Sequence, residues 1–165
     1  MANSSSRDVG HRRALALRLL AIGLLLALIA PARAAAVLGG DVTSVEVDRA
    51  HMRGTVRRVP SETYAVHEIA APSGTVVREY ISPRGTIFAV AWEGPWMPDL
   101  RQLLGTYFEP YASARATGAD RLARGPVVLR APGLVVELSG HARAFWGRAY
   151  APEMLPARVG TDAIR

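Results

Sequence analysis

The sequence predicts an α+β domain in which an antiparallel sheet packs against one main amphipathic helix, with a short helix near its start. Residues 63–92 hold three segments rich in Val, Ile, Thr, Tyr and Phe between Pro-Gly turns, which is typical of a three-strand meander. Residues 99–108 repeat apolar side chains at helical spacing. A later hairpin is predicted at residues 127–139, where two further apolar segments flank Ala-Pro-Gly.

Length and composition limit the kinds of protein that this chain can be. The chain has 165 residues, half of them hydrophobic, which suffices for one packed domain. It has no cysteine, which excludes disulfides, thiol nucleophiles and cysteine-bound zinc. The net charge is +6 and every basic residue is Arg, but 5 of the 20 Arg precede position 35. The remaining Arg are scattered, so no nucleic-acid partner is predicted.

The first 34 residues have the pattern of a secretory signal peptide. A basic segment precedes an apolar run over residues 19–30, and small residues follow. Cleavage is expected between Ala34 and Ala35, or alternatively after Ala36. The run is shorter than the roughly 20 residues of a membrane span, although an uncleaved anchor is the alternative. Arg12 and Arg13 leave both the general secretory and the twin-arginine export routes open.

Residues 35–62 are expected to form a lead-in, and residues 37–165 a single α+β domain. The lead-in holds a short helix over residues 42–52, ended by Gly54, and then a connector with a short strand at residues 55–59. Three strands follow at residues 63–70, 75–81 and 86–92. The third is apolar on both faces, because Ile87 and Ala89 share one face and Phe88 and Val90 share the other. This strand should therefore be central and covered on both sides.

The main helix is expected to start at Pro98 and Asp99, because proline suits the first turn and a carboxylate suits the positive end of the helix dipole. Pro110 is expected to end or kink it. Residues 112–125 have no strong pattern and are predicted to be an exposed loop. The tail, residues 140–165, is expected to pack along the domain without a regular element.

Several of these motifs together resemble a known family. The run from Arg78 to Pro95, including Ile-Phe-Ala-Val-Ala-Trp-Glu-Gly-Pro, and the later Pro98-Asp-Leu-Arg-Gln-Leu-Leu-Gly are similar to the exported proteobacterial proteins grouped as domain of unknown function (DUF) 2844. The resemblance covers most of the chain after the leader. It implies a secreted or periplasmic protein, and it brings no activity and no catalytic residues.

The familiar catalytic and metal-binding motifs are missing. His51, His67 and His141 have no metal-ligand spacing, so no metal and no cofactor are expected. There is no G-x-S-x-G elbow, no phosphate-binding loop and no G-x-G-x-x-G.

Glu79 is the candidate buried carboxylate. In strict alternation it shares a face with Val77 and Ile81, and in the core it would need an arginine partner or a raised pKa. Arg101 is one candidate partner. The alternative places Glu79 on the open face of an edge strand, paired across the sheet.

The corner between the third strand and the main helix is the candidate binding surface, formed by Trp92, Glu93, Trp96 and Met97. A stiff, partly apolar loop on a rigid scaffold suits a partner or an apolar ligand. The alternative is that Trp92 and Trp96 are core residues. Trp92 continues the face of Phe88, which favours the core for that side chain.

The sequence favours an exported, non-enzymatic binding or accessory module of the cell envelope, periplasmic or secreted. Its partner would be an envelope protein or an apolar ligand, with membrane contact only if the leader is retained. The alternative is a small hydrolase or lyase with a carboxylate/histidine acid–base pair. The candidates for that pair are Glu79, Glu93, Asp99, His67 and His141.

Overall fold

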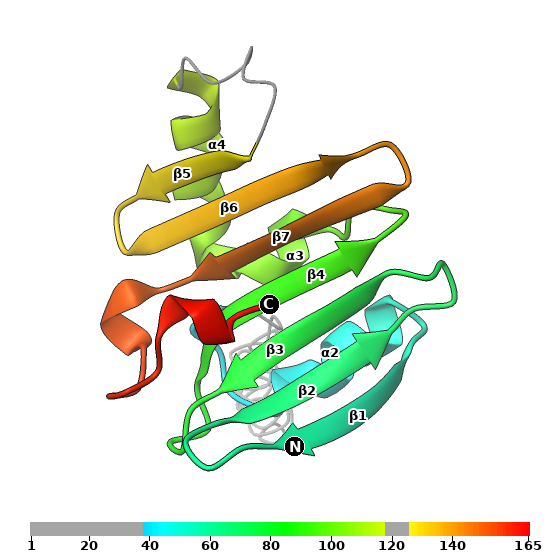
Figure 1. The fold of residues 1–165 in the computed structure, drawn as a ribbon, viewed down its shortest axis with the longest axis vertical. Helices are drawn as coiled ribbons and strands as arrows, with labels where there is room; N and C mark the ends of the chain where they lie inside the picture. The colour runs from blue at the N-terminus through cyan, green and yellow to red at the C-terminus, as the bar shows by residue number, and fades with distance from the viewer. Residues whose placement is uncertain (1–37, 118–125) are drawn as a thin grey trace, which may run out of the picture. The chain divides into compact units, whose positions relative to one another are not determined.

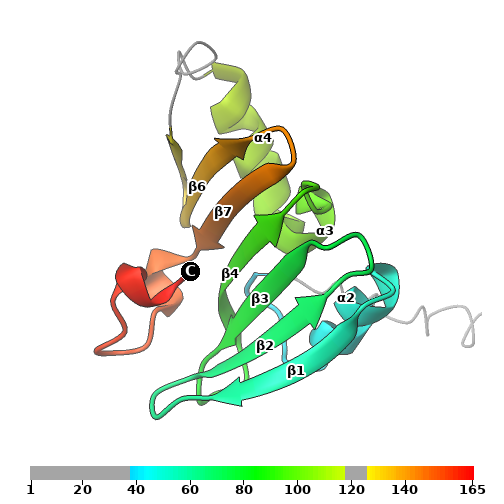
Figure 2. The same ribbon diagram turned by 45° about the vertical axis from the view of Figure 1, so that its right-hand side comes forward.

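Seven antiparallel strands form one sheet in the order β1-β2-β3-β4-β7-β6-β5 (Figure 1). The computed structural model describes residues 38–117 and 126–165, so the expected signal peptide and its cleavage residues, Ala34 and Ala35, lie outside the described residues. Helices cover one face of the sheet and the tail lies on the other (Figure 2). The α+β class, with a short first helix and a main helix packed on an antiparallel sheet, is confirmed. The strands are β1 (Thr55–Pro60), β2 (Ala65–Ala70), β3 (Val76–Ile81), β4 (Ile87–Gly94), β5 (Val127–Ala131), β6 (Leu134–His141) and β7 (Ala144–Tyr150).

The lead-in forms the predicted short helix and short strand, and the strand joins the sheet. The short helix α2 (Ser44–His51) is present, and β1 pairs along its whole length with β2, so the meander has four strands. All six residues of β1 are exposed. A strand with Arg57, Arg58 and Pro60 is a typical sheet edge, because charge and proline discourage further pairing.

The tail supplies a central strand, which corrects the expectation of an irregular segment. β7 lies between β4 and β6 and pairs with both. Gly147 and Arg148 weaken its strand signal in the sequence. The segment becomes a strand because it satisfies the main-chain hydrogen bonds of two neighbours that would otherwise be open edges. Residues 151–165 do pack along the sheet, with short 3₁₀ turns at Pro152–Met154 and Thr161–Ala163.

The main helix is longer than expected and is broken. Asp99 caps α3 (Leu100–Leu104) by accepting hydrogen bonds from the main-chain N–H groups of Arg101 and Gln102. A 3₁₀ turn (Gly105–Tyr107) leads into α4 (Phe108–Thr117). Pro110 therefore does not end the helix, because it lies in the first turn of α4, where no intrahelical donor is required. The predicted loop is wrong over residues 112–117, and residues 118–125 lie outside the described part.

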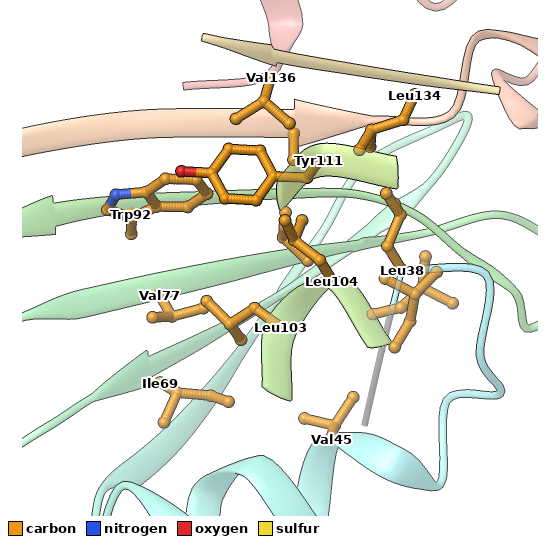
Figure 3. Packing of buried hydrophobic residues seen from close by; sticks show 14 of the residues in the cluster. Leu38, Val45, Ile69, Val77, Trp92, Leu103, Leu104, Tyr111, Leu134 and Val136 are labelled. Atoms are coloured by element: carbon orange, nitrogen blue, oxygen red, sulfur yellow. The ribbon is translucent and has the colours of Figure 1, made fainter. Parts of the chain in front are cut away.

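β4 separates two apolar clusters. On the helix side, Val45 of α2, Leu104 of α3 and Tyr111 of α4 pack on the sheet, in one cluster with Trp92 of β4 (Figure 3). Tail residues such as Ile164 cover the other side. The first six residues of β4, Ile87–Trp92, are all buried, as the sequence predicts for a central strand.

Strict alternation fails at the start of β4. A register shift opposite Tyr80 and Ile81 puts Ile87 in the helix-side cluster with Val90. The same shift puts Phe88 in the tail-side cluster with Ala89. A β-bulge changes which face each following side chain takes, and it leaves no mark in the hydrophobic pattern.

Candidate functional site

The corner after β4 has an anchored main chain. The hydroxyl of Thr75, the residue just before β3, donates a hydrogen bond of 2.9 Å to the carbonyl oxygen of Trp96. Gly94 has a φ of +147°, and a Cβ there would lie 2.6 Å from Cα of Thr75. Only glycine permits this approach, so the end of β4 and the corner are held against β3.

The four candidate residues of the corner divide between surface and core. Trp96 is 60% exposed and Met97 is 41% exposed. Glu93 is exposed and forms an ion pair of 2.6 Å with Arg78 on β3. Trp92 is 1% exposed and lies in the helix-side core, so it is not part of the surface.

A third tryptophan lies beside Glu93 at this end of the sheet, and sequence reasoning missed it. Trp146 on β7 is 43% exposed and lies directly opposite Glu93 in the sheet register. In a strand, Trp146, Arg148 and Tyr150 would point to the same face of the sheet. This spacing could have indicated the position of Trp146, but only if the segment had been predicted to be a strand. We call Glu93, Trp96, Met97 and Trp146 the aromatic corner.

Glu79 is buried beneath the helices. It is 1% exposed, and Asp48 on α2, also 1% exposed, faces it. Burial, and then the neighbouring Asp48 carboxyl, raise the pKa of Glu79 to about 9. Burial also raises the pKa of Asp48, although Asp48 accepts a hydrogen bond from the side-chain amide of Gln102. Two ionised carboxylates are both acceptors, so this pair forms a hydrogen bond only by holding a proton.

Arg101 is not the partner of Glu79. Its guanidinium pairs with Glu109 at 3.1 Å and lies 4.2 Å from the ring centroid of Phe108. The charge of Glu79 is therefore removed by protonation and not by an arginine.

Of the acid–base candidates, the structure brings His67 and Glu79 together. They are directly opposite each other on β2 and β3. Burial, and then the positive charge of Arg58, lower the pKa of His67. Its Nδ1 atom is buried and has no hydrogen-bond partner in the described part of the chain. His67 also lines a pocket of about 400 Å³ together with Arg58 and Ser61.

The other candidates lie apart from this pair. Glu93 is bound to Arg78, and Asp99 caps α3, with one carboxylate oxygen 4.0 Å from Nε2 of His51. His141 is exposed at the end of β6.

A family model described as a protein of unknown function (DUF2844) matches residues 34–164. The chain belongs to the DUF2844 family. Neither a curated protein nor a solved structure matches it. The family description carries no activity, so the evidence for what this DUF2844 protein does lies in its own side chains.

Two further properties of the DUF2844 fold bear on its chemistry. Within residues 38–117 and 126–165, no three His, Asp or Glu residues lie close enough together to hold a metal ion. Over the same residues, no helix has the length and apolar character that crossing a membrane requires. The described side chains offer an exposed aromatic surface on a fixed main chain and a buried carboxyl pair beside a histidine.

Proposed function

We propose that this DUF2844 protein is an exported binding module of the cell envelope, which holds an envelope protein or an apolar ligand on its aromatic corner. The observation that carries the proposal is the 60% exposure of Trp96 on a main chain anchored to Thr75. Exposed tryptophan is costly to leave in water and is enriched at the centres of protein interfaces.

The rigidity of the corner supports this role. Because the main chain at Trp96 is already held in place, a partner would pay little additional loop entropy on binding. Met97 and Trp146 extend the apolar surface, and the pair between Glu93 and Arg78 gives it a charged rim. An apolar centre with a polar rim is the usual composition of a protein interface.

The proposed location rests on the leader. The basic start, the apolar run and the small residues around Ala34 support export with cleavage of residues 1–34. Mass spectrometry of the protein recovered outside the cytoplasm tests it. A mass beginning at Ala35 or Val37 is expected, whereas a mass beginning at Met1 would refute cleavage.

Affinity capture from envelope extract tests the corner. Wild type, Trp96→Ala and Val128→Ala are compared, because Val128 is a 44% exposed apolar residue on the far edge strand β5. A partner retained by wild type and Val128→Ala but lost by Trp96→Ala is then purified, and its dissociation constant measured. Identical partner lists for all three proteins would refute the corner as the binding surface.

A second candidate function is a small hydrolase or lyase that uses His67 and Glu79. The supporting observation is their opposition across β2 and β3, beside a pocket that reaches His67. A carboxyl group that holds its proton at neutral pH has the property required of a general acid. Purified protein is screened on ester, amide and glycoside substrates. Turnover that disappears in both Glu79→Gln and His67→Ala would support this function, and turnover unchanged by both would exclude this pair.

A further inference from the structure

A row of charged side chains crosses the face of the sheet that carries the tail. The residues are in direct register from strand to strand, so their side chains share this face. Arg57 pairs with Glu68 at 3.0 Å, Glu68 with Arg78 at 3.0 Å, and Glu137 with Arg148 at 2.8 Å. The complete row is Arg57, Glu68, Arg78, Ala91, Arg148 and Glu137.

Ala91 interrupts this row at its centre. It lies on β4 between Arg78 on β3 and Arg148 on β7, and its methyl group is the smallest side chain of the six. Strands two apart in a sheet are separated by roughly 10 Å, so the two arginines stand on either side of Ala91, which is buried in the tail-side cluster with Ile164. A pocket of about 300 Å³ lies in this region, with both arginines in its wall.

The pocket combines an apolar surface with positive charge. Trp146 and Ile164 line it from β7 and from the tail. Its charged lining residues are Arg78, Arg148, Arg165 and Glu93. Arg78 is paired with Glu68 and Glu93, and Arg148 with Glu137, so the guanidinium of Arg165 is the one in this lining without a carboxylate partner among the described residues, and it favours an anion.

One N–H donor of the Arg148 guanidinium has no hydrogen-bond partner among the described residues. Its Nη1 atom donates to the carbonyl oxygens of Thr161 and Ile164, and its Nη2 atom donates to Glu137. Its Nε atom is buried and has no acceptor among the described residues. A buried donor left without an acceptor costs about 1–3 kcal/mol, so an acceptor oxygen supplied by a ligand would be stabilising there.

We propose that this pocket binds a small organic carboxylate with a single-ring apolar body. The carboxylate of the ligand accepts charge-assisted hydrogen bonds from the arginine side chains of the pocket. Its ring packs against Trp146 and Ile164. The volume is at the lower end of the range for ligand pockets, which limits the occupant to a molecule of this size. The pocket shares Glu93 and Trp146 with the aromatic corner but is not lined by Trp96, so its failure would leave the partner proposal at Trp96 standing.

Sodium phenylacetate and its neutral counterpart phenylacetamide test the site on the purified full chain by calorimetry and NMR. Phenylacetate is expected to bind saturably, and at least about tenfold more tightly than the amide, because only the carboxylate is charged. In wild type, the methyl signals of Ala91 and Ile164 are expected to shift on titration. Absence of saturable binding, equal affinity for the amide, or shifts confined to the region of Trp96 would each overturn the proposal.

Two pairs of matched variants locate the binding. Trp146→Ala is expected to weaken phenylacetate binding at least about tenfold, whereas Trp96→Ala leaves it unchanged. Arg148→Lys keeps a positive charge but removes the Nε–H donor, so it should also weaken binding, whereas Arg57→Lys at the exposed end of the row should not. Circular dichroism and thermal melting establish that each variant is folded. Equal losses within both pairs in folded variants would overturn the assignment.

Discussion

The carboxyl groups of Asp48 on α2 and Glu79 on β3 face each other in the interior, with both residues 1% exposed. Ionisation of both would place two negative charges together at low dielectric, which is why the folded chain keeps a proton on the pair. The folded-state pKa of Glu79 is about 9, against an ordinary value of 4.5. Proton binding by this pair is therefore linked to folding.

The contribution of Glu79 to the free energy of unfolding should fall as pH rises from about 4.5 to about 9. In that window the unfolded chain has released the Glu79 proton and the folded chain still binds it. The stability that protonated Glu79 contributes is fully present below pH 4.5. Above pH 4.5 it decreases by up to roughly 1.4 kcal/mol for each pH unit. Glu79→Gln should flatten this slope and be more stable than wild type at pH 8, as measured by urea unfolding between pH 4 and 9.

The matched control for that series is Glu62→Gln, at an exposed position between β1 and β2. It should keep the pH slope of wild type. A slope in Glu79→Gln as steep as in wild type would show that Glu79 is not the linked group.

Arg58→Gln should raise the pKa of His67. Burial is the larger cause of the lowered pKa, and the positive charge of Arg58 is the other. NMR titration of the His67 ring protons measures the change. Arg57→Gln is the matched control, because Arg57 is opposite Glu68 and takes the other face of the sheet. An equal shift in both variants would contradict a specific effect of Arg58.

Two tryptophans four residues apart should respond very differently to truncation. Trp92→Ala removes a fully buried ring and should destabilise the protein by about 3–5 kcal/mol. Trp96→Ala removes a ring that is 60% exposed and should change the free energy of unfolding by less than about 0.5 kcal/mol. Guanidinium unfolding followed by circular dichroism measures both. Comparable losses would mean that the ring of Trp96 packs into the core.

Gly147→Ala should destabilise the fold, by roughly 1–3 kcal/mol. A Cβ at Gly147 would lie 2.4 Å from the ring of Trp92, which is directly opposite it on β4. Unfolding by urea measures the loss. In a Trp92→Leu background the same substitution should cost less, because the clashing ring is gone. An equal cost in both backgrounds would place the strain elsewhere.

Local patterns in the sequence were enough to predict the elements whose signals are local. The Pro-x-Gly turns, the alternation of β2 and β3, the capping Asp99 and the period of Leu100, Leu103 and Leu104 each depend on residues close in the chain. Pro110 was expected to end or kink the main helix, but the break lies earlier, at Gly105–Tyr107, because Pro110 falls in the first turn of a new helix that begins just before it. The exposed position of Trp96 was left open by the sequence, because hydrophobicity does not distinguish a surface anchor from a core residue.

The sequence by itself determined the class of fold, the absence of cysteine chemistry, the central place of β4 and the DUF2844 resemblance. Only the tertiary structure decided that β7 enters between β4 and β6, that Trp146 joins the aromatic corner, and that Asp48 is the neighbour of Glu79. The physical reason is the range of the interactions. Periodicity and capping act within a few residues, whereas strand order and the pairing of buried charges depend on which distant segments leave hydrogen bonds and charge to be satisfied.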